Sequence, residues 1–205
     1  CIAIDTVTVK GFTLRNGTPP YGRGGVFRNA GDAGQSATGP ITLLEDCIVS
    51  DGNASSGGGI GDEGKLTIRR CKVQNNTATI YGGGIDTFAN TVIEDSEIVD
   101  NSTRYGGGIA NNGKMVVRRT LIANNTATDD GGGFLAIYDN SWLTNVTITG
   151  NTATAGGGGL SCGNEFGNDC NTRISHSTIA GNTSADGGGI KRFAGTATLR
   201  ATIIA

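Results

Sequence analysis

Short stretches in which apolar and polar residues alternate return along the chain at a nearly constant interval. In each, a small or polar residue is followed two positions later by an aliphatic one, and most steps between successive pairs are 24 to 26 residues. The pairs are Phe12/Leu14, Cys47/Val49, Cys71/Val73, Ser96/Ile98, Thr120/Ile122, Val146/Ile148, Ser177/Ile179 and Thr202/Ile204. A second alternating stretch, such as Leu66 to Ile68, lies upstream of each pair. Alternation this short indicates strands with one buried face, so the pattern predicts a coil of parallel strands, three to a turn.

The polar positions of the pattern are repeated as well. The stretch Asn125 to Phe134, NTATDDGGGF, returns in related form from Asn76, Asn101, Asn151 and Asn182. A repeat of this length indicates an array of stacked turns. We therefore expect residues 1–205 to form a single β-solenoid of roughly eight partial or complete turns. Two steps are longer, because polar insertions occupy about residues 30–40 and 162–170.

Charged residues indicate the register of these turns. Two residues before the pairs, successive turns carry Glu45, Arg69, Glu94 and Arg118, and one residue before they carry Asp46, Arg70, Asp95 and Arg119. Stacked strands lie about 4.8 Å apart, and opposite charges at that distance attract each other. Because the signs alternate in both columns, we predict that Arg69 lies between Glu45 and Glu94. The same register places Cys71 directly beside Cys47.

A further column lies three residues after each aliphatic position. It reads Gly17, Gly52, Asn76, Asn101, Asn125, Asn151 and Asn182. Glycine and asparagine both tolerate positive φ, so we predict a sharp corner with positive φ at these residues. The asparagine side chains are also able to stack as a hydrogen-bonded ladder, and a ligand-binding row is the alternative. The triple glycines lack the helix start and Lys-Ser/Thr of a phosphate loop, which favours close packing or a tight corner.

The cysteines fall into two groups. Cys47 and Cys71 occupy a position that is otherwise small, which predicts inward-facing fillers, with a disulfide between them as the lesser alternative. Cys162 and Cys170 bracket the second insertion, and in an oxidising compartment a disulfide would tie that loop down. The alternative is two free thiols. Metal binding is disfavoured because the one histidine, His176, stands in another strand without a partner motif, and no cofactor site is predicted.

Composition narrows the class of protein. Glycine supplies 36 of the 205 residues, aromatic residues 5% and charged residues 17%, so large core residues are few, yet the charge is too low for a disordered chain. A formal net charge of -2 without a basic run argues against nucleic-acid or anionic-membrane partners. No apolar run approaches the roughly 18 residues that cross a bilayer. We expect an export signal, if there is one, to lie outside this chain.

Candidate catalytic groups are sparse. Polysaccharide lyases and hydrolases with a solenoid shape need clustered carboxylates, often with Ca²⁺ or a neighbouring Arg or Lys. The two best sets are Asp62 and Glu63 beside Asp86, and Asp130 with Asp186, Lys191 and Arg192. We expect both sets to be solvated surface, because no aspartate column recurs, and we therefore assign no catalytic residue.

Threonine rows suggest a third class of function. Thr-Ala-Thr occurs at 77–79, 126–128 and 152–154, and a flat array of such hydroxyls is a feature of ice-binding surfaces. Arg104 and Ala185 interrupt the row, so ice binding is a minor alternative.

The repeat resembles a known family. GGG followed by Ile, Phe or Leu, together with Val73-Gln74-Asn75-Asn76 and Ile122-Ala123-Asn124-Asn125, is similar to the paired GGA-[ILV] and FxxN motifs of the chlamydial polymorphic outer-membrane protein repeat. It is equally similar to right-handed parallel β-helix repeats of bacterial surface proteins. This chain has a third Gly in place of Ala and Ile or Val in place of Phe. The resemblance implies a secreted or surface-displayed, adhesin-like solenoid, frequently part of a longer polypeptide.

Together these patterns predict an all-β, right-handed parallel β-helix. We expect a structural or adhesive module, extracellular or at the cell surface, with a carbohydrate-active β-helix enzyme as the alternative. Because the last strand carries no polar cap, we expect either a segment of a larger protein or copies stacked end to end as a filament. Candidate partners are surface glycans, host or neighbouring-cell proteins, and further copies of the chain.

Overall fold

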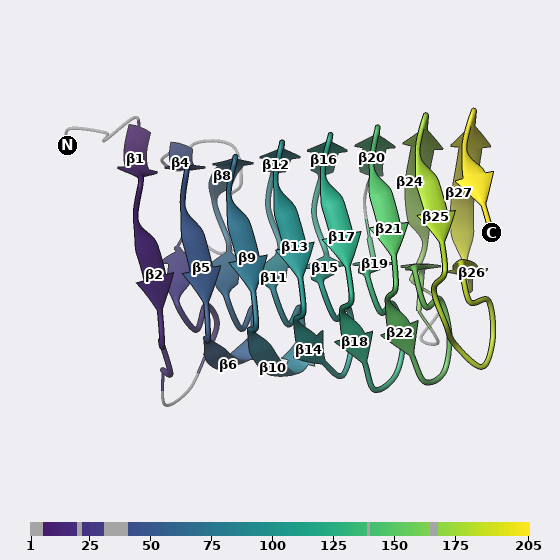
Figure 1. Ribbon diagram of the computed structural model, residues 1–205, viewed down its shortest axis with the longest axis horizontal. Helices are drawn as coiled ribbons and strands as arrows, with labels where there is room; N and C mark the ends of the chain where they lie inside the picture. Colours follow the sequence, from purple (N-terminus) through teal and green to yellow (C-terminus); the bar gives the residue numbers. More distant parts are fainter. Residues whose placement is uncertain (1–5, 20–21, 31–40, 139, 165–167) are drawn as a thin grey trace.

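The chain is a parallel β-solenoid, which confirms the predicted fold class (Figure 1). The computed structural model describes residues 6–19, 22–30, 41–138, 140–164 and 168–205. Every regular element within these residues is a strand, and the strands form four parallel sheets stacked along the molecule, with eight, eight, five and seven strands. The first predicted insertion lies mostly outside the described residues, as does the middle of the second.

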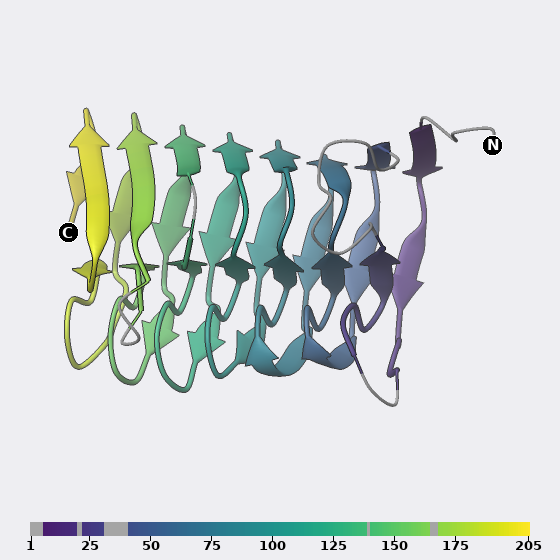
Figure 2. The ribbon, with the colours of Figure 1, turned by 180° about the vertical axis from the view of Figure 1, so that it is seen from behind.

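We name the sheets A to D in the order in which the chain passes through them. Sheet A contains β1 (Thr6–Lys10), β4 (Ile41–Glu45), β8 (Lys65–Arg69), β12 (Thr91–Glu94), β16 (Met115–Arg118), β20 (Asn140–Thr144), β24 (Cys170–Ser175) and β27 (Gly195–Arg200). Sheet B contains β2 (Thr13–Arg15), β5 (Ile48–Ser50), β9 (Lys72–Gln74), β13 (Glu97–Val99), β17 (Leu121–Ala123), β21 (Thr147–Thr149), β25 (Thr178–Ala180) and β28 (Ile203–Ile204). Sheet A lies toward the viewer in Figure 2, and sheet B lies toward the viewer in Figure 1.

The other two sheets complete each turn. Sheet C contains β6 (Asn53–Ser56), β10 (Thr77–Tyr81), β14 (Ser102–Thr103), β18 (Thr126–Ala127) and β22 (Thr152–Ala153). Sheet D contains β3 (Phe27–Asn29), β7 (Ile60–Asp62), β11 (Ile85–Thr87), β15 (Ile109–Asn111), β19 (Phe134–Ala136), β23 (Leu160–Cys162) and β26 (Ile190–Arg192).

A complete turn therefore holds four short strands, and the prediction of three was wrong. Three strands of sheet C have only two residues each, too few for alternation to appear in the sequence. The described chain completes about six turns, slightly fewer than the eight partial or complete turns that we predicted.

The predicted register is confirmed by the pairing of the strands. Val73 pairs with Val49 on one side and with Ile98 on the other, and Arg69 lies between Glu45 and Glu94. Cys71 neighbours Cys47, and the backbone N–H of Cys47 donates to the Sγ of Cys71 at 3.4 Å. The aliphatic column lies in the main core of the solenoid, and its buried members are Val49, Val73, Ile98, Ile122, Ile148 and Ile179.

The corner between sheets A and B explains why the first residue of each pair is small. The residue before it has positive φ, for example 50° at Arg70 and 52° at Asp95. The chain then turns inward, where a hydroxyl or thiol donates to the backbone carbonyl two residues earlier. Ser96 Oγ donates to Glu94 O at 2.7 Å and Cys71 Sγ to Arg69 O at 3.2 Å. In the turns that carry Ser, Thr or Cys at this position, a small donor thus fills the corner and satisfies its backbone, whereas Val146 fills it with an apolar side chain.

The corner between sheets B and C contradicts one prediction. Asn76, Asn101, Asn125, Asn151 and Asn182 are not among the residues with positive φ. The preceding column has it instead, at Asn16, Asp51, Asn75, Asp100, Asn124, Gly150 and Gly181. The left-handed corner is therefore made one residue earlier than predicted, and the asparagine that follows is free to point inward.

These five asparagines form a ladder of side-chain hydrogen bonds along the solenoid. The Nδ2 of each of the first four donates to the Oδ1 of the next asparagine at 2.9 to 3.0 Å. The same Nδ2 donates to an aliphatic residue's carbonyl one turn earlier, as from Asn125 to Ile98 O at 2.9 Å. The Oδ1 of Asn125 also accepts the backbone N–H of Asn101 at 3.0 Å. The ladder therefore satisfies buried backbone groups that the corner leaves outside the sheets.

The triple glycines form the corner between sheets C and D. The first of each set has positive φ, such as 70° at Gly131. A Cβ on the second, Gly132, would overlap the carbonyl oxygens of Gly158 and Thr152 in the next turn. The expectation of a tight corner with close backbone packing is confirmed, since any side chain there would push successive turns apart.

Candidate functional site

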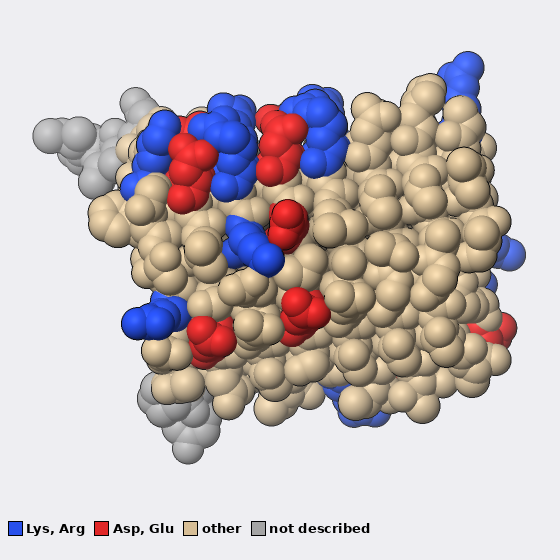
Figure 3. Space-filling model, viewed as in Figure 1, with Lys and Arg blue, Asp and Glu red and all other residues tan. Residues whose placement is uncertain are grey.

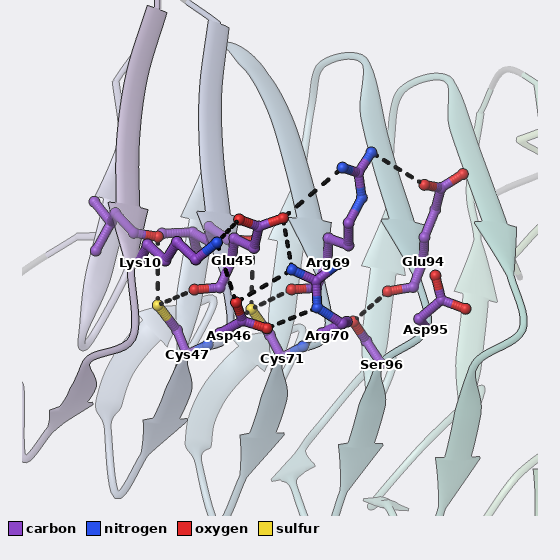
Figure 4. Close-up of polar contacts among 12 residues, drawn as sticks. Lys10, Glu45, Asp46, Cys47, Arg69, Arg70, Cys71, Glu94, Asp95 and Ser96 are labelled. Carbon is purple, nitrogen blue, oxygen red and sulfur yellow. Dashed lines mark hydrogen bonds and ion pairs between the residues drawn. The ribbon is translucent and has the colours of Figure 1, made fainter.

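Charged side chains gather along the corner between sheets A and B (Figure 3). Lys10 Nζ lies 2.7 Å from Glu45 Oε2, and Arg70 Nη2 lies 2.7 Å from Glu45 Oε1. Arg119 pairs with Asp95 through two contacts of 2.6 and 2.9 Å. Figure 4 shows the N-terminal part of this row, where Arg69 reaches both Glu45 and Glu94 at 3.9 and 3.4 Å.

These pairs neutralise the surface on which they lie. Hydrogen bonds from Arg70 lower the pKa of Asp46, and those from Arg119 lower the pKa of Asp95. Both carboxylates are thereby held ionised and engaged by their neighbours. The row links successive turns and leaves no concentrated negative field that would attract a cation.

Asp62 belongs to the interior of the solenoid. Its Oδ1 accepts from Asn29 Nδ2 at 2.8 Å and from the N–H of Gly64 at 3.0 Å, and its Oδ2 accepts from Thr91 Oγ1 at 2.6 Å and from Thr87 Oγ1 at 3.0 Å. Burial raises the pKa of Asp62, and these donors oppose that effect. The expectation of a solvated Asp62 was therefore wrong, because this carboxylate organises the corner between sheets D and A.

Asp86 lies on the opposite, outward face of sheet D. It is nevertheless fully buried, because Arg23, two turns earlier, and Asn112, in the next turn, contact it, with Nε 3.8 Å from Oδ2 and Nδ2 3.4 Å from Oδ1. The Oδ2 atom has no hydrogen-bond partner within the described part of the chain. Burial raises the pKa of Asp86 to about 7, while the charge of Arg23 lowers it. The prediction of a solvated residue was wrong for Asp86 too.

Glu63 completes the cluster around Asp86. Its carboxylate accepts from Arg28 Nη2 at 2.9 Å and lies 3.7 Å from Arg23 Nη1. The guanidinium carbon of Arg23 stands 3.7 Å from the centre of the Phe88 ring, so the cation covers the carboxyl group below it. The cluster therefore places a carboxyl group with a raised pKa, that of Asp86, near a second carboxyl group, an arrangement that general acids use. A substrate has no access to Asp86 unless Arg23 moves.

The second predicted acidic set is not assembled as a carboxylate pair. Asp130 is buried and bridges to Gly156 in the next turn, so its expected solvation is also contradicted. The backbone of Asp186 lies one turn further on, beside Gly157. Asp186 is exposed and pairs with Lys191 at 3.4 Å, whose ammonium lies over Phe193. Arg192 donates to the carbonyl of Gly195 at 3.2 Å.

The four described cysteines are either disulfide-bonded or buried in the core. Cys162 and Cys170 are joined by a disulfide at the base of the second insertion. Cys47 and Cys71 are free and buried, in accord with the predicted fillers, and burial raises the pKa of Cys71 to about 11. A thiol with that pKa is neutral and weakly reactive. Among the residues that the structure describes, no group of three or more His, Cys, Asp or Glu is arranged to hold a metal ion.

The threonine rows lie on the outward face of sheet C. Thr77, Ser102, Thr126 and Thr152 stand in register on successive strands. Arg104 interrupts the parallel row, although its side chain is drawn toward Asp129 at 3.4 Å and over the ring of Tyr105. The face is thus rich in hydroxyl groups but is not a continuous threonine array.

Sequence reasoning missed one surface residue that has the chemistry of a binding site. Trp142 is the middle residue of β20, and it is half-buried on the outward face of sheet A. It stands in register between Val116 and Arg173. The alternation of Ser141, Trp142 and Leu143 was the available signal, because it places the ring on the outer face.

Four parallel sheets wound around one aliphatic core, with polar columns at the corners, define a parallel β-solenoid. The chain belongs to the family described as the right-handed β-helix region, whose model matches residues 3–168. No curated protein and no solved structure matches the chain. None of the described segments is a helix long and apolar enough to cross a membrane.

Proposed function

We propose that the chain is a structural or adhesive module of an extracellular or cell-surface protein, without catalytic activity of its own. The observation that carries the proposal is the placement of the acids. Asp62 accepts four hydrogen bonds inside the core, while Asp86, one turn away, lies buried on the other face of sheet D. A glycosidase needs two carboxyl groups flanking one substrate bond, and these two do not share a face.

The interactions that hold successive turns together support the same function. The ladder of asparagines and the rows of paired charges stabilise the stacking of turns, which suits a stiff rod that displays flat faces. The similarity of the GGG motifs and of the FxxN-like motifs, such as Val73 to Asn76, to repeats of bacterial outer-membrane and adhesin-like proteins supports a surface location. Surface glycans, proteins of a host or neighbouring cell, and further copies in a filament are the partners that such a rod would serve.

Turnover and adhesion assays test this proposal together. We expect no new reducing or unsaturated ends when the purified chain is incubated with polygalacturonate, alginate or similar polymers. We also expect beads that carry the folded chain to be retained on at least one immobilised polysaccharide or cell surface more strongly than beads that carry the heat-unfolded chain. Cleavage that disappears in Asp62→Ala, Asp86→Ala or Asp130→Ala would overturn the proposal.

A carbohydrate-active enzyme is the second candidate, and one observation favours it. The carboxyl group of Asp86 has a pKa of about 7 and lies near Glu63, beneath the side chain of Arg23. In that case turnover would depend on both carboxyl groups. Asp86→Asn and Glu63→Gln would each abolish it, whereas the exposed Asp186→Asn would not.

A further inference from the structure

The two halves of sheet A differ in charge on their outward face. The first four strands, β1 to β12, carry acids and bases that pair across turns. The strands β16, β20, β24 and β27 contain Arg118, Arg173 and Arg200 but no acidic residue. The C-terminal half of this face is therefore locally basic on a chain whose formal net charge is -2.

Trp142 lies in the middle of the basic half. Val116, Arg118, Trp142 and Thr144 line a shallow hollow of about 400 Å³, and Arg173 pairs with Trp142 on the next strand. We call these five residues the Trp142 face. Beside it, Asn171 donates to Asn140 at 2.6 Å, which fixes the two strands that carry the tryptophan and the arginine.

Two polar groups of the Trp142 face have no partner. Neither the indole N–H of Trp142 nor the guanidinium of Arg173 forms a hydrogen bond or ion pair with a described residue. Arg118, by contrast, pairs with Glu94 at 3.5 Å. Arg173 therefore carries an unpaired guanidinium on the strand next to that of the aromatic ring, and neighbouring strands lie about 4.8 Å apart, so an anion site is offered beside an apolar platform.

We propose that the Trp142 face binds a uronate residue of an acidic polysaccharide. The apolar face of a sugar ring packs on the indole, as large aromatic groups favour, and the guanidinium of Arg173 holds the carboxylate, a pairing that is often bidentate. The hydroxyl of Thr144, which pairs with that of Ser175 at 3.1 Å, and the indole N–H supply hydrogen bonds to sugar hydroxyls. This inference rests on the proposed adhesive function, for which it names the class of ligand.

The single tryptophan of the chain reports on the site directly. The experiment titrates the folded chain with oligogalacturonate and, as a matched neutral ligand, with its fully methyl-esterified form, and follows Trp142 emission. We expect a saturable change with the free acid alone, weakened by added salt. Arg173→Gln should reduce the affinity about tenfold, which corresponds to about 1.4 kcal/mol. Trp142→Ala removes the fluorophore, so ligand binding to this variant is measured by titration calorimetry. We expect no binding, with a circular dichroism spectrum that remains that of the folded chain.

Arg15→Gln is the charge-matched control, because Arg15 is exposed at the end of β2 in sheet B. We expect it to bind like the unmodified chain. An unchanged emission with the free acid, equal binding of the methyl ester, or an equal loss in Arg15→Gln would each overturn the inference. Polymer cleavage would instead overturn the proposed function, so the two failures are distinguishable.

Discussion

The adjacent residues Asn124 and Asn125 have separate roles, and substitutions separate them. Asn124 is exposed with a φ of 56°, whereas the buried Asn125 side chain donates to Ile98 O and Asn151 Oδ1 and accepts two bonds from Asn101. Asn125→Ala removes all four of these hydrogen bonds. At about 1 kcal/mol net for each, with buried partners left unsatisfied, we expect a loss of about 3–5 kcal/mol. For a chain of this length, that lowers Tm by roughly 10 °C.

The glycine variants give the decisive comparison. Asn125→Gly should be no better than Asn125→Ala and should cost about 0.5–1 kcal/mol more, because this backbone is not left-handed. At Asn124 the order reverses: Asn124→Gly should stay within about 0.5 kcal/mol of the unmodified chain, while Asn124→Ala should lose about 1 kcal/mol. Thermal and urea unfolding followed by circular dichroism measure all four variants. If Asn125→Gly were tolerated better than Asn125→Ala, the conclusion that Asn125 stabilises the fold through the hydrogen bonds of its side chain would be refuted.

Three other perturbations test separate parts of the fold. Burial raises the pKa of Asp86 from 3.8 to about 7. Asp86→Asn should therefore stabilise the chain above pH 7 by up to about 4 kcal/mol and make little difference to stability below pH 4. A pH-independent effect in urea unfolding would contradict this. Gly132→Ala should cost about 3 kcal/mol or more, because its Cβ would overlap the carbonyl of Gly158, and a normal Tm would refute the packing argument. Asp95→Asn, which tolerates the same φ, should lower Tm slightly in dilute buffer and not at about 1 M salt, because Arg119 lowers the pKa of Asp95. The stability from this pair is present above the usual aspartate pKa and is lost as pH falls through the lowered one.

The sequence was sufficient for the register and insufficient for the corners. Aliphatic residues and alternating charges repeat once per turn, so one alignment placed Val73 and Arg69 correctly. The positive-φ column was misplaced by one residue, since both residues of this corner are types that accept that conformation, and two turns carry consecutive asparagines, Asn75-Asn76 and Asn124-Asn125. Asp51, Asp100, Gly150 and Gly181 in the preceding column were the available signal, because aspartate and glycine also accept that conformation.

The candidate site was harder to predict for a physical reason. A charged residue in one sequence is normally taken to be exposed, yet Asp62 and Asp86 are buried by groups from other turns. Arg23, which covers Asp86, is more than sixty positions away along the chain and reaches it at 3.8 Å. The alternation around Trp142 identified this residue only as part of a strand. Its role in a binding site depends on Arg173, which lies in register with it on the far side of the second insertion.

The two insertions share a place in the fold that has a consequence for how such a chain is lengthened. Both fall between a strand of sheet D and the next strand of sheet A, after β3 and after β23. The stack pairs in register on either side of the second loop, as Trp142 with Arg173, and the Asn151–Asn182 bond spans the same step at 2.9 Å. We therefore expect the corner between sheets D and A to accept a grafted loop or binding peptide, while the other three corners keep the spacing of the turns.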